Sequence, residues 1–142
     1  MPIIEAGVMY EGILLVKNRY YDETEIDSFL TSSFLETIQK FGKEAFKDDT
    51  EFFRMKRYTI YLHKISLKKS KDLVTVYIIC YSKDPEKVIR RIISKIANEF
   101  IKEYPVISHP ETTRYKKFKE KMSSIIGDLR YKTEDRLKKV FT

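Results

Sequence analysis

The chain has 142 residues, 42% of them hydrophobic and 13% aromatic, which excludes a disordered polypeptide and suits one domain of roughly 100–150 residues. Its single cysteine, Cys80, excludes an intrachain disulfide and indicates a reducing compartment. The formal net charge is +7, and +6 of it lies between Thr113 and Thr142, where ten residues are basic and four acidic. The excess charge is therefore a property of the C-terminal segment.

The N-terminus and the hydropathy of the chain predict a cytoplasmic protein. The stretch Met1–Glu5 lacks the basic and long apolar regions of a signal peptide. No apolar run approaches the ~20 residues that a membrane span needs. We expect one domain that covers residues 1–142.

Two strands and a helix are predicted first. Alternating apolar residues predict strands over Ile3–Tyr10 and Ile13–Tyr21, joined by a tight turn at Glu11-Gly12. Acidic residues crowd the start of a helix expected over Thr24–Gly42, where the helix dipole favours negative charge. The apolar stripe of this helix consists of Ile26, Leu30, Phe34, Ile38 and Phe41.

Strands of the middle region come next. Phe52–Leu67 alternates as one long strand, or as two strands with a break near Lys56. Leu73–Tyr81 is apolar on both faces, which is typical of a central strand that is covered on both sides.

Two helices are predicted last. Asp84 is the expected N-cap of the first of them and Pro85 its first helical residue, and Pro105 marks its end. The final helix is expected over Thr113–Val140. Its apolar stripe consists of Tyr115, Phe118, Met122, Ile125, Leu129 and Leu137.

Sequence motifs of catalysis and ligand binding are absent. The four glycines form no phosphate-binding loop, and one cysteine and two histidines supply few ligands for zinc. Either histidine could be catalytic in principle, but we expect His63 on a strand surface and His109 in a linker. Cys80 is expected to be a small buried hydrophobe. The sequence predicts a protein that is not an enzyme and that holds no metal or cofactor.

The order of elements resembles that of the longin domain. Two strands, a helix, a meander of strands and two helices follow one another, beginning with the hairpin Ile3–Tyr21. Tyr58–Leu62 is similar to a later strand of the family, Tyr81–Pro85 to its strand-to-helix turn, and Ala97–Tyr104 to its Phe-containing helix end. The roadblock domain, which usually has a helix before its first strand, is the nearest alternative, and profilin-like sensor domains are a third.

The resemblance implies an α+β fold with a central antiparallel five-stranded sheet in the order 2-1-5-4-3, flanked by one helix on one face and two on the other. It also implies a non-catalytic protein-interaction module, acting as a scaffold or regulatory subunit for a small GTPase or a trafficking-type complex. The implied partner is a small GTPase or another longin or roadblock subunit, in a homo- or heterodimer. Since no SNARE helix or anchor follows the predicted helices, the chain resembles the stand-alone longin proteins of adaptor or tethering complexes, or a simpler prokaryotic or archaeal relative.

The second strand and the helix after it form the first candidate contact surface. In the implied sheet order Ile13–Tyr21 is an edge strand, and an apolar edge invites pairing with another chain. Leu35 is expected to point away from the apolar stripe of the helix, towards a partner. The predicted interface residues are Leu14, Val16, Asn18, Tyr20, Phe34, Leu35 and Ile38.

The basic last helix is the alternative contact surface. Lys116, Lys117 and Lys121 could meet an anionic membrane surface or, less expected, nucleic acid. The protein would then be an adaptor in peripheral contact with the membrane. The competing interpretation is an ordinary solvated helix face, on which lysine stems lie along apolar neighbours.

Overall fold

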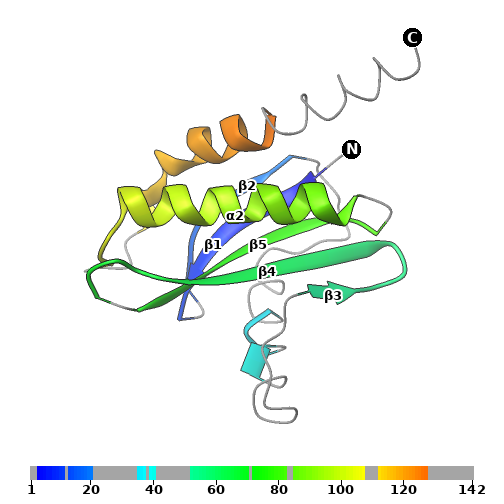
Figure 1. Ribbon diagram of the computed structural model, residues 1–142, viewed down its shortest axis with the longest axis horizontal. Coiled ribbons are helices and arrows are strands. Elements are labelled where there is room, and N and C mark those ends of the chain that lie inside the picture. Colours follow the sequence, from blue (N-terminus) through cyan, green and yellow to red (C-terminus); the bar gives the residue numbers. More distant parts are fainter. Residues whose placement is uncertain are drawn as a thin grey trace.

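One antiparallel sheet organises the computed structural model, which describes residues 3–11, 13–20, 35–37, 39–40, 52–70, 72–82, 85–107 and 112–127. The strands lie in the order β2-β1-β5-β4-β3 (Figure 1). They are β1 (Ile3–Tyr10), β2 (Ile13–Arg19), β3 (Phe52–Arg54), β4 (Tyr58–Ser66) and β5 (Leu73–Tyr81). The α+β class, the sheet order and the break near Lys56 are confirmed.

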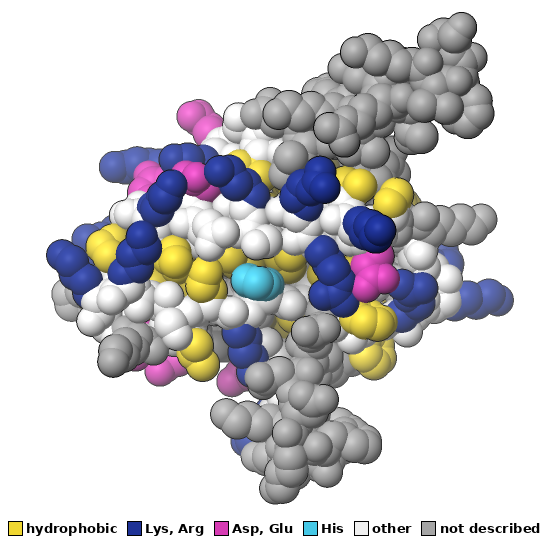
Figure 2. Space-filling view, viewed as in Figure 1, with side chains coloured by type: hydrophobic (Ala, Val, Ile, Leu, Met, Phe, Trp, Pro, Cys, Tyr) yellow, Lys and Arg dark blue, Asp and Glu magenta, His cyan; other side chains and the backbone are white. Residues whose placement is uncertain are grey.

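Helical segments cover both faces of this sheet. Helix α2 (Glu86–Glu103) and helical residues 118–127 lie on one face (Figure 1), and the helical residues 35–37 pack on the other through Leu35. Lys and Arg side chains line the outer surface of α2 (Figure 2), as expected for the solvated side of an amphipathic helix. Among the described residues, no helix has the length and apolar content required to cross a membrane.

Strand β5 separates two hydrophobic cores. Val76, Ile78 and Cys80 face α2, whereas Tyr77 and Ile79 face the side on which Leu35 packs. All seven residues from 74 to 80 are buried, so the prediction of a central strand covered on both sides is confirmed. Cys80 is 1% exposed, as expected of a buried hydrophobe. His63 lies half-buried on β4, whereas His109 lies outside the described residues.

A β-bulge explains the apolar run of β2. Val8 pairs with Val16 and Met9 with Leu14, so Leu15 is an extra residue in the ladder. Because a bulge changes the alternation of side chains, Leu15 and Val16 both enter the core beneath α2, where they are 2% and 5% exposed. The second half of the run Ile13–Val16 therefore fills the interior, whereas Ile13 is 40% exposed and Leu14 is half-buried.

Helix α2 begins one residue later than predicted. Pro85 has an extended backbone, with φ −63° and ψ 119°, and occupies the N-cap position, so that Glu86 is the first helical residue. Proline restricts φ to a value near −65° that also suits a helix, so the sequence leaves this boundary open. The expected N-cap, Asp84, lies outside the described residues. The end at Glu103, before Pro105, is confirmed.

The last helix also begins differently from the prediction at Thr113. Residues Thr112–Tyr115 form the 3₁₀ turn η1, a turn follows at 116–117, and α-helix begins at 118. Tyr115 and Phe118 both pack against Phe100, with ring centroids 6.0 and 5.2 Å apart. These two residues of the predicted apolar stripe are therefore buried, although the α-helix starts later than expected. The part of the predicted helix after residue 127 lies outside the described residues.

A glycine in β1 allows a tyrosine in β5 to lie flat across the sheet. Gly7 and Tyr77 are directly opposite each other. A Cβ atom at position 7 would lie 2.6 Å from Cε1 of Tyr77 and 2.7 Å from its Cζ and Oη. Since Tyr77 is only 2% exposed, its ring has little room to move away.

Gly7→Ala is therefore expected to destabilise the fold by about 1–3 kcal/mol, the usual cost of overpacking a core. Urea denaturation would measure the change in the free energy of unfolding. Tyr77→Leu removes the three atoms that the new Cβ would meet, so Gly7→Ala should cost clearly less in that background. An equal cost in both backgrounds would rule out the ring contact as the cause.

Candidate functional site

A cluster of ionisable side chains lies buried within the sheet, on the Leu35 side. The Tyr77 hydroxyl donates a hydrogen bond of 2.6 Å to Oε2 of Glu5, and Nε of Arg19 lies 3.0 Å from Oε1. Glu5 is 0% exposed. Burial, reinforced by the negative charge of Glu5, raises the pKa of Tyr77 well above its usual value of 10.

The geometry of this cluster favours a structural role. Both carboxylate oxygens of Glu5 have a partner, which a buried charge requires. Neither of the two surface hollows described below is lined by Glu5, Arg19 or Tyr77. The cluster ties three neighbouring strands, β2, β1 and β5, together.

Tyr77→Phe should lower the free energy of unfolding by about 1–3 kcal/mol, because it leaves a buried carboxylate oxygen without its donor. The raised pKa fixes how this difference depends on pH. The Tyr77 hydroxyl holds its proton more tightly in the folded state than in the unfolded state. Its contribution to stability is therefore complete below about pH 10, and it is lost as the pH rises through the raised pKa of the folded state. Denaturation midpoints measured from pH 7 to above 10 should therefore converge for the two proteins. A constant difference over that range would contradict this assignment.

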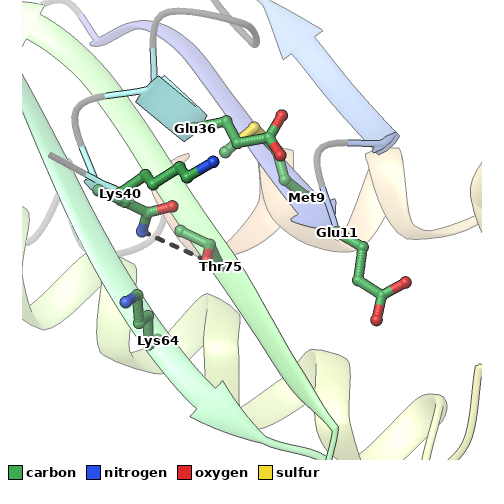
Figure 3. Close-up of a pocket in the computed structure, with 7 residues that line it drawn as sticks. Met9, Glu11, Glu36, Lys40, Lys64 and Thr75 are labelled. Carbon is green, nitrogen blue, oxygen red and sulfur yellow. Dashed lines mark hydrogen bonds between the residues drawn. The ribbon is translucent and has the colours of Figure 1, made fainter. Parts of the chain in front are cut away.

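The first surface hollow, of about 280 Å³, has balanced charges. It lies on the side of the sheet that carries helical residues 35–37 and 39–40, and the carboxylate of Glu11 lies apart from the amines of Lys40 and Lys64 (Figure 3). The residues that line it are Met9, Glu11, Glu36, Gln39, Lys40, Lys64 and Thr75. Two acids and two bases give it no preference for an anion or a cation. No group of three or more potential metal ligands occurs among the residues that the structure describes.

The second hollow is a groove beside the edge strand β2, with a volume of about 180 Å³. Its walls combine apolar residues of β2 with amines from β2 and from the start of the C-terminal helical segment. The lining residues are Leu14, Leu15, Val16, Lys17, Lys116 and Lys119. We call this the β2 groove. The three charged residues among the described part of its lining are all basic.

Polar contacts hold the far wall of the β2 groove against the sheet. The amide of Asn18 donates hydrogen bonds to the carbonyl oxygen of Lys119 at 2.7 Å and to Oγ of Ser123 at 3.1 Å. The hydroxyl of Tyr20 lies 3.1 Å from the same Oγ. Phe118 and Met122 are buried on the same segment. The groove is therefore held by both apolar packing and hydrogen bonds.

The structure corrects two residues of the predicted protein interface. Val16 is 5% exposed because of the bulge, and Leu35 is 0% exposed. Adjacent residues of a helix are about 100° apart, and a core-facing stripe can be wider than that. Leu35 therefore packs against the sheet and not against a partner.

The other predicted interface residues have different surroundings. Leu14 is half-buried and lines the β2 groove. Asn18 and Tyr20 are engaged by the C-terminal segment of their own chain. Phe34 and Ile38 lie outside the described residues.

The three lysines of the predicted basic face are separated in the structure. Lys116 and Lys117 are exposed in the turn before residue 118, and Lys116 lines the β2 groove. Nζ of Lys121 instead lies 3.2 Å from a carboxylate oxygen of Glu99 on α2. Hydrogen bonds from Lys121 and Lys95 lower the pKa of Glu99. Lys121 therefore helps to hold the C-terminal segment on α2.

Lys17 and Lys119 belong to the groove but were not predicted. Lys17 directly follows Val16 in the strand, and Lys119 lies three residues after Lys116. Both spacings were readable in the sequence. The contact between β2 and the C-terminal segment, which brings these lysines to one groove, could not be predicted from the sequence.

Comparison with known proteins adds no relative. No family model matches the chain, and no curated protein matches it at a significant level. The likeness to longin domains therefore rests on the order of elements and on the sheet topology.

Proposed function

We propose that this chain is a non-catalytic protein-interaction module, and that it binds an acidic segment of a partner protein in the β2 groove. The observation that carries the proposal is the convergence of Lys17, Lys116 and Lys119 on one apolar-walled hollow. None of the described residues that line this hollow is acidic, so an acidic ligand would meet complementary charge.

The size of the groove favours a side chain over a cofactor. Pockets for small-molecule ligands usually measure about 300–1,000 Å³, whereas this one has about 180 Å³. An acidic residue with an apolar neighbour would match its walls, since the apolar part gains burial and the carboxylate reaches an amine.

Strand β2 is poorly suited to simple extension of the sheet by a partner. The bulge at Leu15 interrupts the regular spacing of its backbone groups, and Lys17 adds charge to the edge. Both features discourage strand addition. The partner is accordingly recognised through its side chains in the groove.

The resemblance to longin domains suggests which proteins to test. It favours a small GTPase or another longin or roadblock subunit, in a homo- or heterodimer of a cytoplasmic trafficking complex. A scaffold or regulatory role for the GTPase is proposed on this likeness of fold alone.

The alternative is an adaptor that meets an anionic membrane surface or nucleic acid through the basic C-terminal segment. Its support is the exposure of Lys116 and Lys117, which are adjacent in a turn. The pairing of Lys121 with Glu99 at 3.2 Å removes one of the three cations expected there.

The proposal predicts that Lys17→Glu/Lys119→Glu weakens partner binding at least about tenfold at low salt, because two attractive contacts become repulsive. A photo-crosslinking residue at position 14, which lines the groove and leaves its three lysines in place, would first capture the partner for identification by mass spectrometry. Calorimetry with the purified partner would then measure affinity. The loss should shrink at about 0.5 M salt, since screening weakens exposed charges.

Lys68→Glu/Lys69→Glu is the matched control, because both lysines are exposed in the turn after β4. It makes the same change in net charge and should leave the affinity unchanged. Equal losses of affinity in both variants would mean that net charge alone causes the effect, and would contradict binding in the groove. Unchanged affinity of the Lys17/Lys119 variant would also contradict it.

A further inference from the structure

Strand β3 and the turn that follows it combine exposed hydrophobic and basic side chains. Phe52, Phe53 and Met55 are 41%, 36% and 38% exposed. They make up three of the six exposed large hydrophobics among the described residues, within four positions. The basic residues of this stretch are Arg54, Lys56 and Arg57, and it contains no acidic residue. We call Phe52–Arg57 the β3 patch.

Hydrogen bonds hold the backbone of the β3 patch in place. The amide of Met55 donates to the carbonyl oxygen of Tyr58 at 2.7 Å. Ser82, at the end of β5, donates from its amide to the carbonyl oxygen of Arg57 at 2.9 Å and from its hydroxyl to that of Met55 at 2.8 Å. The turn is therefore anchored to the central strand, and its side chains project from a fixed support.

Two arginine side chains lie over one aromatic ring of the patch, that of Phe52. The guanidinium carbons of Arg54 and Arg90 lie 5.7 and 5.8 Å from the ring centroid of Phe52. Arg90 is also paired with Glu86 at 2.8 Å, so its charge is shared. Figure 2 shows hydrophobic and basic side chains close together at the end of the molecule that carries β3 and the start of α2. Because Glu86 offsets the charge of Arg90, the excess positive charge around Phe52 comes from Arg54, Lys56 and Arg57 of the β3 patch.

We propose that the β3 patch is a contact site for an anionic phospholipid membrane. Exposed apolar side chains such as phenylalanine gain burial at the boundary between lipid headgroups and acyl chains. Lysine and arginine beside them are attracted to the negative surface potential of anionic lipids. A fixed turn that presents both kinds of side chain meets these two requirements at one place.

Membrane contact suits the patch better than nucleic-acid binding does. Stacking of bases requires accessible ring faces. The ring of Phe52 has two arginines over it, and Tyr58 is stacked on Tyr81 with a centroid distance of 5.7 Å. Stacking on these rings would have to displace contacts that are already made.

This site is independent of the β2 groove. The strand order puts β3 and β2 at opposite edges of the sheet. A membrane bound at β3 would therefore leave the groove accessible to a protein partner.

The test is sedimentation of the purified full chain with vesicles of phosphatidylcholine alone, or with about 30% phosphatidylserine. Binding should require the anionic lipid. Met55→Ser/Lys56→Glu should weaken it at least about tenfold, because it removes an exposed apolar group and reverses one charge. The thermal unfolding midpoint should not change, since the backbone contacts of the turn do not involve these side chains.

Leu73→Ser/Lys69→Glu is the matched control. It makes the same kinds of change at the other end of the β4–β5 hairpin, where Leu73 is 53% exposed, and it should bind like the wild type. The proposal would be overturned by equal loss in this control, by no binding of the wild type to anionic vesicles, or by loss only in Lys116→Glu/Lys117→Glu. The proposal would also be overturned if the chain bound single-stranded RNA but not vesicles, and if Met55→Ser/Lys56→Glu abolished the binding of RNA.

Discussion

The burial of β5 on both faces is the constraint on which the rest of this structure depends. Seven consecutive residues, from 74 to 80, are withdrawn from solvent, so helical segments must pack on both sides of the sheet. One face carries α2 and residues 118–127, and the other receives Leu35. Within the sheet, Tyr77 crosses Gly7 to reach Glu5, which Arg19 of β2 also binds. Strands β2, β1 and β5 are thereby joined by polar as well as apolar contacts.

Because the central strands are covered on both faces, the candidate binding surfaces lie at the two edges of the sheet. At one edge, the bulge turns Leu15 and Val16 inward and Asn18 holds the C-terminal segment, which leaves a lysine-lined groove. At the other edge, Ser82 anchors the turn after the short strand β3. A groove for an acidic protein segment and a turn for an anionic membrane would together make an adaptor, with the two sites at opposite edges.

Much of the fold could be predicted from the pattern of apolar residues, which indicated the strands and left open only whether Phe52–Leu67 forms one strand or two. The two-sided apolarity of Leu73–Tyr81 identified the central strand. The details that shape the candidate site could not. A bulge changes the side-chain alternation by one residue without any signal in the sequence, which is why Val16 was assigned to an interface. Leu35 was assigned there because the width of a buried helical stripe depends on its neighbours. Likewise, the pairing of Lys121 with Glu99 depends on how two helical segments pack, and local sequence does not specify that.

The single cysteine offers the most direct test of the central claim. Cys80 lies on β5, faces the core beneath α2 and is 1% exposed. Its labelling by a chromophoric thiol reagent should therefore require unfolding of the domain, and the labelling rate should increase with urea as global unfolding does. Labelling of the native protein at the rate of a free thiol would mean that β5 is not covered on that face, and would contradict the account.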